Sequence, residues 1–206
     1  YCCLHRGAYS CSVELVDGIP TDKFVTSFMK RAFMLRRVGV EAVFVFDGGR
    51  MPGKANEEAD RGRNRFEAKT RARKHARAGN TTAANEQYQR AVDVSPEMAL
   101  AVIHELKKNG FECSVAPYEA DAQMAYLIRN DFVNGIVTED SDMIPHKCAS
   151  VFFKMDNDGI GQEIRYDDIQ KNKDLSFVGF TSDQFLEMCV MSGCDYLPSL
   201  PGVGAY

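Results

Sequence analysis

The chain has 206 residues, 45% of them hydrophobic, and its formal net charge is −4 at pH 7. This length and composition are typical of one globular domain with a sizeable core. No apolar stretch reaches the roughly 18 residues that a membrane-spanning helix requires, so no transmembrane segment is expected.

In chain order, the first predicted element is a helix within residues 20–39, with Thr21 or Asp22 as its cap and Gly39 as its stop. The segment EAVFVFD follows as a compact buried strand that ends at Asp47. Residues 50–77 are predicted to be helical, AGNTT interrupts the helix, and AANEQYQRAV resumes helical spacing.

The predicted helix 50–77 is strongly basic, with ten Lys or Arg residues against four Asp or Glu. The C-terminal half of the chain is acidic. Such asymmetry is typical of a phosphate-binding arm beside an acidic metal site. On charge alone, a solvated charged helix is the better explanation of this segment.

Beyond residue 94, SPEMALAVIHELKKNG predicts a helix with Ser95 as its N-cap and Gly110 as its stop. The segments FECSVA, NGIVTED and SVFFKM predict strands, DNDGIGQEIRY predicts a hairpin turn, and YEADAQMAYLIRN and TSDQFLEMCVMSG predict helices. Strands that alternate with helices indicate an α/β fold with a mostly parallel central sheet flanked by helices.

Carboxylates recur at or near the ends of these elements. They occur at four places along the chain, which we call acidic stations: Asp47, Glu119 with Asp121, Asp140 with Asp142, and Asp195. The side chains of residues i and i+2 in an extended segment point to the same side, so the carboxylates of Asp140 and Asp142 are expected to point toward the same place. Ligands bind outside the carboxyl ends of strands in such sheets, and Asp47 and the Asp140–Asp142 pair are therefore expected on one rim.

Each station also has an ordinary explanation, because acids complement the dipole at the start of a helix and an isolated DxD motif is common. Four stations on one rim instead require a counter-charge. Oxygen ligands without a partnering His or Cys select hard cations, and two Mg²⁺ or Mn²⁺ ions would suit phosphodiester hydrolysis. The seven cysteines form no CxxC pair and their number is odd, which argues against a zinc site or a disulfide framework and for free thiols.

The motifs VFDGG, APYEADAQMAYL, TEDSDMI and MSGCDYLPSLPGVG resemble the structure-specific 5′-nuclease superfamily, which includes flap endonucleases and exonuclease 1. YEADAQ, TEDSD and SGCDY are more similar to the exonuclease 1 subfamily. The resemblance implies a 5′-nuclease fold with a helical arch, and it implies that the six carboxylates above bind the metal ions.

The same resemblance implies that Lys54 and Arg61 are the catalytic basic pair, which contact the scissile phosphate from one face of a helix, with Arg65 one turn further along. It implies DNA contacts for Tyr1 and His5. It also implies a monovalent cation, K⁺ or Na⁺, held by backbone carbonyls of a helix–two-turn–helix element; the candidates are Ser192, Ser199 and Val203.

On this resemblance the chain is a fragment of one nuclease domain. Residues 1–49 are expected to be an N-terminal region without its first strand, 50–94 the arch, 95–191 the internal region and 192–206 the start of the duplex-binding element. A metal-binding Asp is expected two residues before Tyr1, so we expect the isolated fragment to be a poor nuclease. The expected turn at MIPHKC carries Lys147 where the family usually has glycine.

The function implied is a metal-dependent 5′→3′ exodeoxyribonuclease with 5′-flap endonuclease activity, which acts in the nucleus in DNA repair, including mismatch repair. Its partners would be double-stranded DNA with 5′ ends, nicks, gaps or flaps, and repair proteins bound through a further C-terminal region; no membrane is expected. The alternatives are a flap endonuclease of the same superfamily and a DNA-junction binding module without catalysis. A phosphatase is disfavoured, because no DxDx(T/V) motif follows a first strand.

Overall fold

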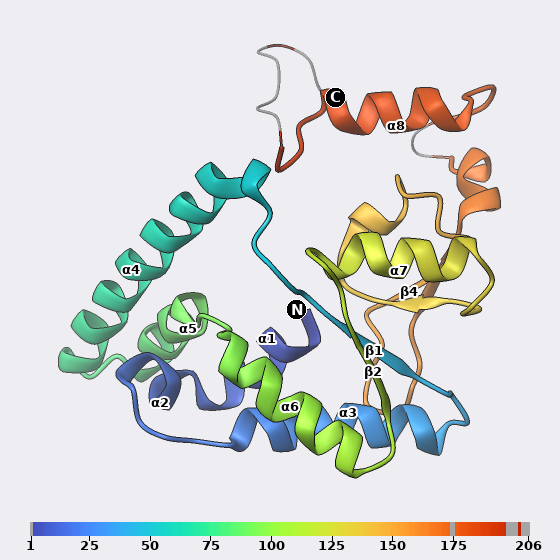
Figure 1. The fold of residues 1–206 in the computed structure, drawn as a ribbon. Coiled ribbons are helices and arrows are strands. Elements are labelled where there is room, and N and C mark those ends of the chain that lie inside the picture. The colour runs from blue at the N-terminus through green and yellow to red at the C-terminus, as the bar shows by residue number, and fades with distance from the viewer. Residues whose placement is uncertain (1, 174–175, 197–201, 203–206) are drawn as a thin grey trace. The chain divides into compact units, whose positions relative to one another are not determined.

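The computed structural model describes residues 2–173, 176–196 and 202, and the chain divides into two compact units (Figure 1). Unit 1 comprises Tyr1–Phe46 and Ala55–Val115, whereas unit 2 comprises Asp47–Lys54 and Ala116–Tyr206. Each unit has its own buried cluster of hydrophobic side chains. Within the described ranges, no helix is both long and apolar enough to cross a bilayer.

Unit 1 is a helical unit with one two-stranded parallel sheet, in which β1 pairs with β2 from Val43 opposite Glu112 to Phe46 opposite Val115. Its elements in chain order are α1 (Cys2–Ala8), the 3₁₀ turn η1 (Tyr9–Cys11), α2 (Ser12–Asp17), α3 (Lys23–Arg37), β1 (Val43–Phe46), α4 (Ala55–Arg77), α5 (Thr81–Ala91), α6 (Pro96–Lys108) and β2 (Glu112–Val115).

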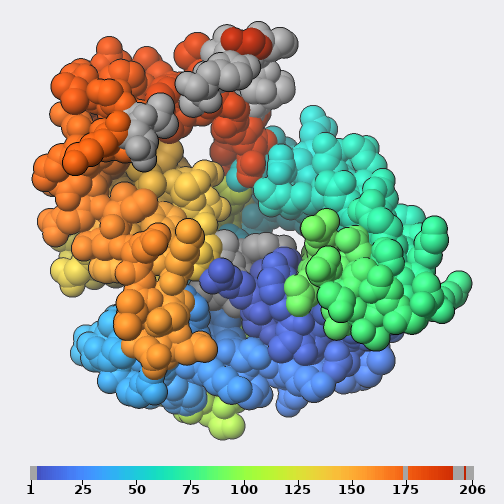
Figure 2. Space-filling model, turned by 180° about the vertical axis from the view of Figure 1, so that it is seen from behind, coloured from blue at the N-terminus to red at the C-terminus, as the bar shows by residue number. Residues whose placement is uncertain are grey.

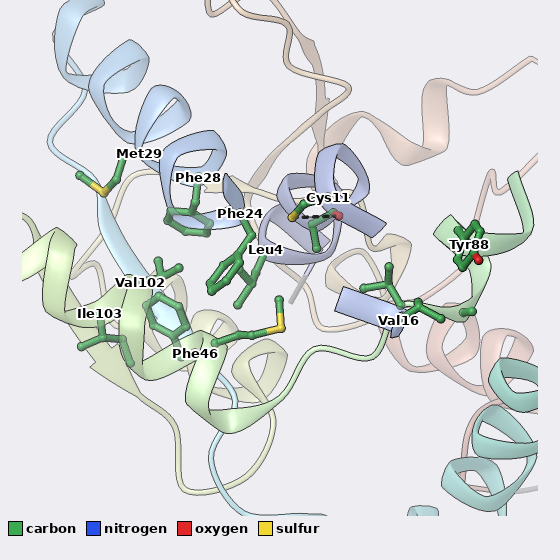
Figure 3. Packing of buried hydrophobic residues seen from close by; sticks show 14 of the residues in the cluster. Leu4, Cys11, Val16, Phe24, Phe28, Met29, Phe46, Tyr88, Val102 and Ile103 are labelled. Carbon is green, nitrogen blue, oxygen red and sulfur yellow. Dashed lines mark hydrogen bonds between the residues drawn. The ribbon is translucent and has the colours of Figure 1, made fainter. Parts of the chain in front are cut away.

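The core of unit 1 forms where α3 and α6 turn their apolar faces inward. Helix α3 buries Phe24, Phe28 and Leu35, in agreement with the predicted helical spacing. Helix α6 buries Val102 and Leu106, and neither of these side chains is exposed at all. Figure 3 shows side chains from α1, α3, β1 and α6 packed into one cluster. This packing fixes β1, the strand that leads to Asp47.

The predicted ends of α6 are confirmed. The Ser95 side chain accepts a hydrogen bond from the backbone N–H of Met98, and Gly110 ends α6 with a φ of +71°. At the start of α5, Asn80 caps the helix by accepting from the N–H of Ala83. These caps satisfy backbone groups that a helix terminus otherwise leaves without partners.

No element was predicted before residue 20, but α1, η1 and α2 occupy this region. Leu4, Ala8 and Cys11 are buried in the unit 1 core and recur at helical spacing, which was the available signal. The thiol of Cys11 donates a hydrogen bond to the carbonyl oxygen of Ala8, 3.6 Å away (Figure 3). It is one of five described cysteines that are free, as expected.

The basic segment is one long helix, α4, which packs along α5 (Figure 1). In the space-filling view the two helices form a continuous surface, coloured teal to green (Figure 2). Ala68 and Ala72 are the buried residues of α4, and they allow a close approach to α5. Lys69 donates a hydrogen bond to the carbonyl oxygen of Val16 at 2.6 Å, which ties α4 to α2.

The described residues of unit 2 form a three-stranded mixed sheet and two α-helices. Its elements are the 3₁₀ turn η2 (Pro52–Lys54), α7 (Ala120–Arg129), β3 (Ile136–Val137), the 3₁₀ turn η3 (Ser141–Met143), β4 (Ser150–Phe153), β5 (Gln162–Arg165), the 3₁₀ turn η4 (Tyr166–Lys171) and α8 (Ser182–Met191). Strand β3 runs parallel to β4, and β4 pairs antiparallel with β5 through the predicted hairpin.

The predicted α/β fold class is confirmed, with one difference in its sheet. The described strands form two small sheets, β1–β2 and β3–β4–β5, and not one continuous sheet. Strand β3 has only two residues, and the chain turns at Ser141–Met143, directly after Asp140, whose own backbone is extended. The idea of a shared sheet rim for the acidic residues therefore fails, and local contacts in unit 2 bring them together instead.

Candidate active site

Asp47 is held against the start of α7. Its Oδ1 accepts a hydrogen bond from the backbone N–H of Ala120 at 2.8 Å. Glu119 occupies the N-cap position of α7 but makes no capping bond with its side chain. Asp47 therefore supplies the cap from a distant part of the chain and leaves the Glu119 carboxylate available for other contacts.

Two glycines after Asp47 allow this approach. The backbone N–H groups of Gly48 and Gly49 donate to the carbonyl oxygens of Tyr118 and Pro117, at 2.6 and 2.9 Å. A Cβ atom at Gly48 would lie 1.9 Å from the carbonyl oxygen of Ala116, so no other residue fits there without movement of the backbone. The close approach of this backbone to residues 116–118 thus explains why glycine follows Asp47 in the VFDGG motif.

Asp121 is partly buried among other carboxylates. Burial, followed by the negative charges of Asp140, Asp47 and Glu119, raises the pKa of Asp121 to about 6. Like charges close to a desolvated carboxyl group disfavour its ionised form. These four carboxylates, predicted from three separate motifs, therefore lie within electrostatic reach of each other in unit 2.

Asp140 and Asp142 lie close together, but the predicted extended geometry between them is wrong. Asp140 accepts a hydrogen bond from the backbone N–H of Asp142 at 3.0 Å and caps the 3₁₀ turn η3. Aspartate side chains readily form such local bonds, which compete with strand structure. Burial, followed by the charges of Asp140 and Asp195, raises the pKa of Asp142.

Lys54 is the counter-charge for part of this cluster. Its ammonium nitrogen lies 2.5 Å from Glu119 Oε1 and 3.0 Å from Asp195 Oδ2. Burial alone would lower the pKa of Lys54, but the hydrogen bonds to Glu119 and Asp195 outweigh burial and raise it. The ammonium group therefore stays protonated and joins two of the predicted acidic stations.

Tyr196 completes this cluster, although the sequence motifs assigned it no role. Its hydroxyl group donates a hydrogen bond to Glu119, and its ring centroid lies 4.6 Å from Lys54 Nζ. A cation over an aromatic face is attracted by the electron density of the ring. Its position directly after Asp195 in the SGCDY motif was the only available signal.

The donor set fits a hard divalent cation. All six predicted ligands are carboxylates, and the raised pKa values of Asp121 and Asp142 indicate negative charge that the protein leaves partly uncompensated. Within the described residues, no group of three or more His, Cys, Asp or Glu side chains has the arrangement of a metal shell. Lys54 instead engages two of the carboxylates.

The other predicted basic residues lie in unit 1. Arg61 pairs with Glu57 at 3.0 Å and Arg65 with Asp93 at 3.6 Å. Lys54, Arg61 and Arg65 were expected on one helical face, but Lys54 belongs to the 3₁₀ turn η2, before α4 begins. The regular spacing of α4 therefore relates Arg61 to Arg65 only.

His5 is partly buried in unit 1, where its ring meets the edge of the Tyr9 ring at a centroid distance of 5.0 Å. Burial is the main cause that lowers the pKa of His5. Ser192 follows α8, and its hydroxyl group donates to the carbonyl oxygen of Met188 at 2.9 Å. The remaining predicted site residues, Tyr1, Ser199 and Val203, lie outside the described residues.

Comparison with known proteins identifies the family. The XPG N-terminal domain matches residues 1–68, and the XPG I-region matches residues 110–195. The chain belongs to the XPG family of 5′-nucleases. The I-region match contains five of the six predicted metal ligands, from Glu119 to Asp195. The resemblance inferred from the sequence motifs is thereby confirmed.

Two similar curated proteins are named exonuclease 1. Exonuclease 1 of Arabidopsis thaliana is 50% identical over 204 residues, which is 99% of this chain and 28% of that protein. Exonuclease 1 of Oryza sativa subsp. japonica is 48% identical over 99% of this chain and 24% of its own length. The chain thus spans about a quarter of the length of these relatives.

The fold is similar to that of a solved protein–DNA complex. The catalytic core of Rad2 in complex with DNA substrate (complex III) matches with a TM-score of 0.64 and 24% identity, over 90% of this chain and 50% of that one. At this level of identity the likeness concerns the fold. It agrees with the α/β fold predicted from the sequence.

Proposed function

We propose that this chain contains the catalytic residues of a divalent-metal-dependent nuclease, which degrades double-stranded DNA in the 5′→3′ direction and also cuts 5′ flaps. The observation that carries the proposal is the cluster in unit 2, where Lys54 bridges Glu119 and Asp195. Asp121 and Asp142 belong to the same cluster, since the negative charge of Asp140 helps to raise the pKa of each. The relatives named exonuclease 1 support an exonuclease activity, and the resemblance of the sequence motifs to 5′-nucleases supports the proposed direction and substrate class.

The proposed cofactors are two Mg²⁺ ions, which Mn²⁺ could replace. The residues that would hold them share a carboxylate side chain and are Asp47, Glu119, Asp121, Asp140, Asp142 and Asp195. When bound, these cations supply Lewis-acid stabilisation of the negative charge that develops during phosphodiester hydrolysis. The proposed monovalent cation, K⁺ or Na⁺, would bind backbone carbonyls at Ser192, Ser199 and Val203.

In this proposal the basic side chains bind and orient the scissile phosphate. The ammonium group of Lys54 is a point charge that can move from carboxylate to phosphate, because both are anionic oxygen groups. The guanidinium group of Arg61 can donate two parallel hydrogen bonds to a phosphate, and Arg65 extends the same side of α4. Tyr196 keeps Glu119 in place through its hydroxyl group.

The proposed substrates are duplexes with 5′ ends, nicks, gaps or flaps, and the proposed setting is DNA repair, including mismatch repair, in the nucleus. Tyr1 and His5 are proposed to contact the DNA near the junction. Repair proteins are the proposed partners, through parts of the gene product beyond these residues.

A nuclease assay on the full-length gene product tests the proposal. We expect Mg²⁺-dependent release of nucleotides from the 5′ ends of a duplex labelled at its 3′ ends, release of a labelled 5′ flap, and no product in EDTA. DNA that is bound but left uncut in Mg²⁺ and in Mn²⁺ would support a binding module instead. Digestion from 3′ ends would contradict the proposed direction.

A further inference from the structure

Helix α4 has a face that points away from the packed part of unit 1. The buried residues Ala68 and Ala72 mark the side that packs on α5. Successive residues of an α-helix are about 100° apart, so the opposite side can be read from the spacing. We call this side the outer face of α4. It is exposed throughout, and its residues are Arg63, Phe66, Glu67, Thr70, Arg73, Lys74 and Arg77.

Phe66 lies in the middle of the outer face with 72% of its surface exposed. A single exposed apolar side chain is common and needs no explanation by itself. Here, however, four of the five charged residues of the face are basic, and its acid, Glu67, pairs with Arg71 at 3.5 Å. Arg63 pairs with Asp60 and Arg73 with Asp17. Among the described residues, Lys74 and Arg77 take part in no ion pair. The outer face therefore combines an open aromatic ring with uncompensated positive charge.

This face differs from the side of α4 that carries Arg61. Arg61 precedes Phe66 by five residues, which places the two side chains roughly 140° apart around the helix axis. Arg61 also pairs with Glu57, whereas Lys74 and Arg77 of the outer face form no ion pair with any described residue. The proposed contact of Arg61 with the scissile phosphate consequently leaves the outer face without a role.

We propose that the outer face of α4 binds single-stranded DNA, with the Phe66 ring stacked on an unpaired base and Lys74 and Arg77 bound to backbone phosphates. Aromatic rings set in a positively charged surface bind single strands in this way, because every base has a flat face. Duplex bases are stacked on one another and offer no face to the ring. The inference rests on the proposed function, because it assumes a DNA substrate.

Binding of a fluorescently labelled oligo-dT strand to the full-length gene product, measured by anisotropy in EDTA, tests this site. We expect Phe66→Ala to weaken binding about tenfold, and Phe66→Tyr to retain affinity because the ring remains. Lys74→Gln and Arg77→Gln should each reduce the slope of log affinity against log salt by about 0.7. Phe132→Ala is the matched control, since Phe132 is 67% exposed, and it should bind like the wild type.

A second readout shows stacking directly. A strand with 2-aminopurine should lose fluorescence on binding to the wild type and to Phe66→Tyr, but not to Phe66→Ala. The inference is overturned if the wild type does not bind the strand, if Phe66→Ala binds it normally, or if Phe66→Ala weakens blunt duplex binding equally. A Phe66-dependent interaction with poly-glutamate alone would indicate an acidic protein partner and would also overturn it. Nuclease activity of the wild type in Mg²⁺ is scored separately, so failure of the proposed function is distinguishable.

Discussion

Lys54 and Glu119 form a close ion pair, with 2.5 Å between the ammonium nitrogen and Oε1. The same ammonium group also reaches Asp195 at 3.0 Å. Lys54, which is proposed to bind the scissile phosphate, therefore forms ion pairs with two of the proposed metal ligands. Divalent cations and the Lys54 ammonium group should compete for the same carboxylates, and this competition can be measured.

Replacing Lys54 should have opposite effects on metal binding and on turnover. In Lys54→Gln, two carboxylates lose their positive partner, so Mg²⁺ should bind more tightly in calorimetric titrations without DNA. The single-turnover rate should fall about 10²–10³-fold, because charge stabilisation of the scissile phosphate is lost. Arg61→Ala should also slow turnover more than it weakens DNA affinity, but without the change in metal binding. A Lys54→Gln protein with unchanged Mg²⁺ affinity would contradict the competition.

Tyr196→Phe separates the two contacts of this side chain. The substitution removes the hydroxyl group that donates to Glu119 but keeps the ring beside Lys54. Loss of a hydrogen bond that orients a metal ligand typically lowers metal affinity or activity about 10- to 100-fold. We expect a higher Mg²⁺ requirement in the nuclease assay and unchanged thermal stability. Equal activity at every Mg²⁺ concentration would remove Tyr196 from the site.

Asp142→Ala should lower cleavage by several orders of magnitude while DNA binding largely survives, since binding depends mainly on phosphate contacts. Asp183→Ala is a suitable control. Asp183 lies in the same unit with 83% of its side chain exposed, and it pairs only with Lys147 among the described residues. Gel-shift binding and single-turnover cleavage should be measured on both variants. Near-normal turnover of Asp142→Ala in Mg²⁺ would show that the metal assignment is wrong.

Gly48→Ala should destabilise unit 2, because its new methyl group would lie 1.9 Å from the carbonyl oxygen of Ala116. The expected loss is about 1–3 kcal/mol in the free energy of unfolding, as for other overpacked sites. Gly62 is the matched control. It lies inside α4, and an added Cβ atom would meet nothing within 4 Å, so Gly62→Ala should stabilise the protein by about 0.5–1 kcal/mol. Urea denaturation of both variants checks the contrast.

Low pH should reduce the stability of unit 1, in part because Asp17 becomes protonated. Hydrogen bonds from Arg73, 2.7 Å away, and Tyr88, 3.2 Å away, lower the pKa of Asp17 below its ordinary value of 3.8. A depressed folded-state pKa contributes stability above the unfolded value, and this contribution is lost as pH falls through the folded one. Asp17→Asn should therefore be less stable than the wild type near neutral pH, with a smaller further loss between roughly pH 5 and pH 3. Parallel acid-denaturation curves would contradict this assignment.

Local patterns in the sequence predicted the helices well. Ser95 and Gly110 delimit α6 because capping and left-handed termination depend on nearby residues. The β4–β5 hairpin was predicted for the same reason, since its turn lies between two short strands in the sequence. The six carboxylates could be selected because acids at the ends of elements stand out against an apolar background.

The arrangement of the site was harder to predict, because its contacts join distant parts of the chain. Nothing near Lys54 in the sequence indicates that its partners are Glu119 and Asp195, nor that Asp47 caps α7. Asp140 and Asp142 were placed on an extended strand because the local hydrogen bond that turns the chain there was not weighed. The missed α1 and α2 are short, and tertiary packing of residues such as Leu4 stabilises them more than helical propensity does.

The short segment Asp47–Lys54 belongs to unit 2 although the chain on both sides of it belongs to unit 1. The polypeptide therefore passes between the units three times, after Phe46, after Lys54 and after Val115. No single cut can separate the two units as intact pieces. A protein that starts at Ala116 would lack both Asp47 and Lys54, so the acidic cluster would lose one carboxylate and its cation together. During synthesis, the ribosome therefore completes Asp47–Lys54 long before the rest of unit 2. Unit 2 can fold completely only when its later part, from Ala116 onward, has been made and has joined this early segment.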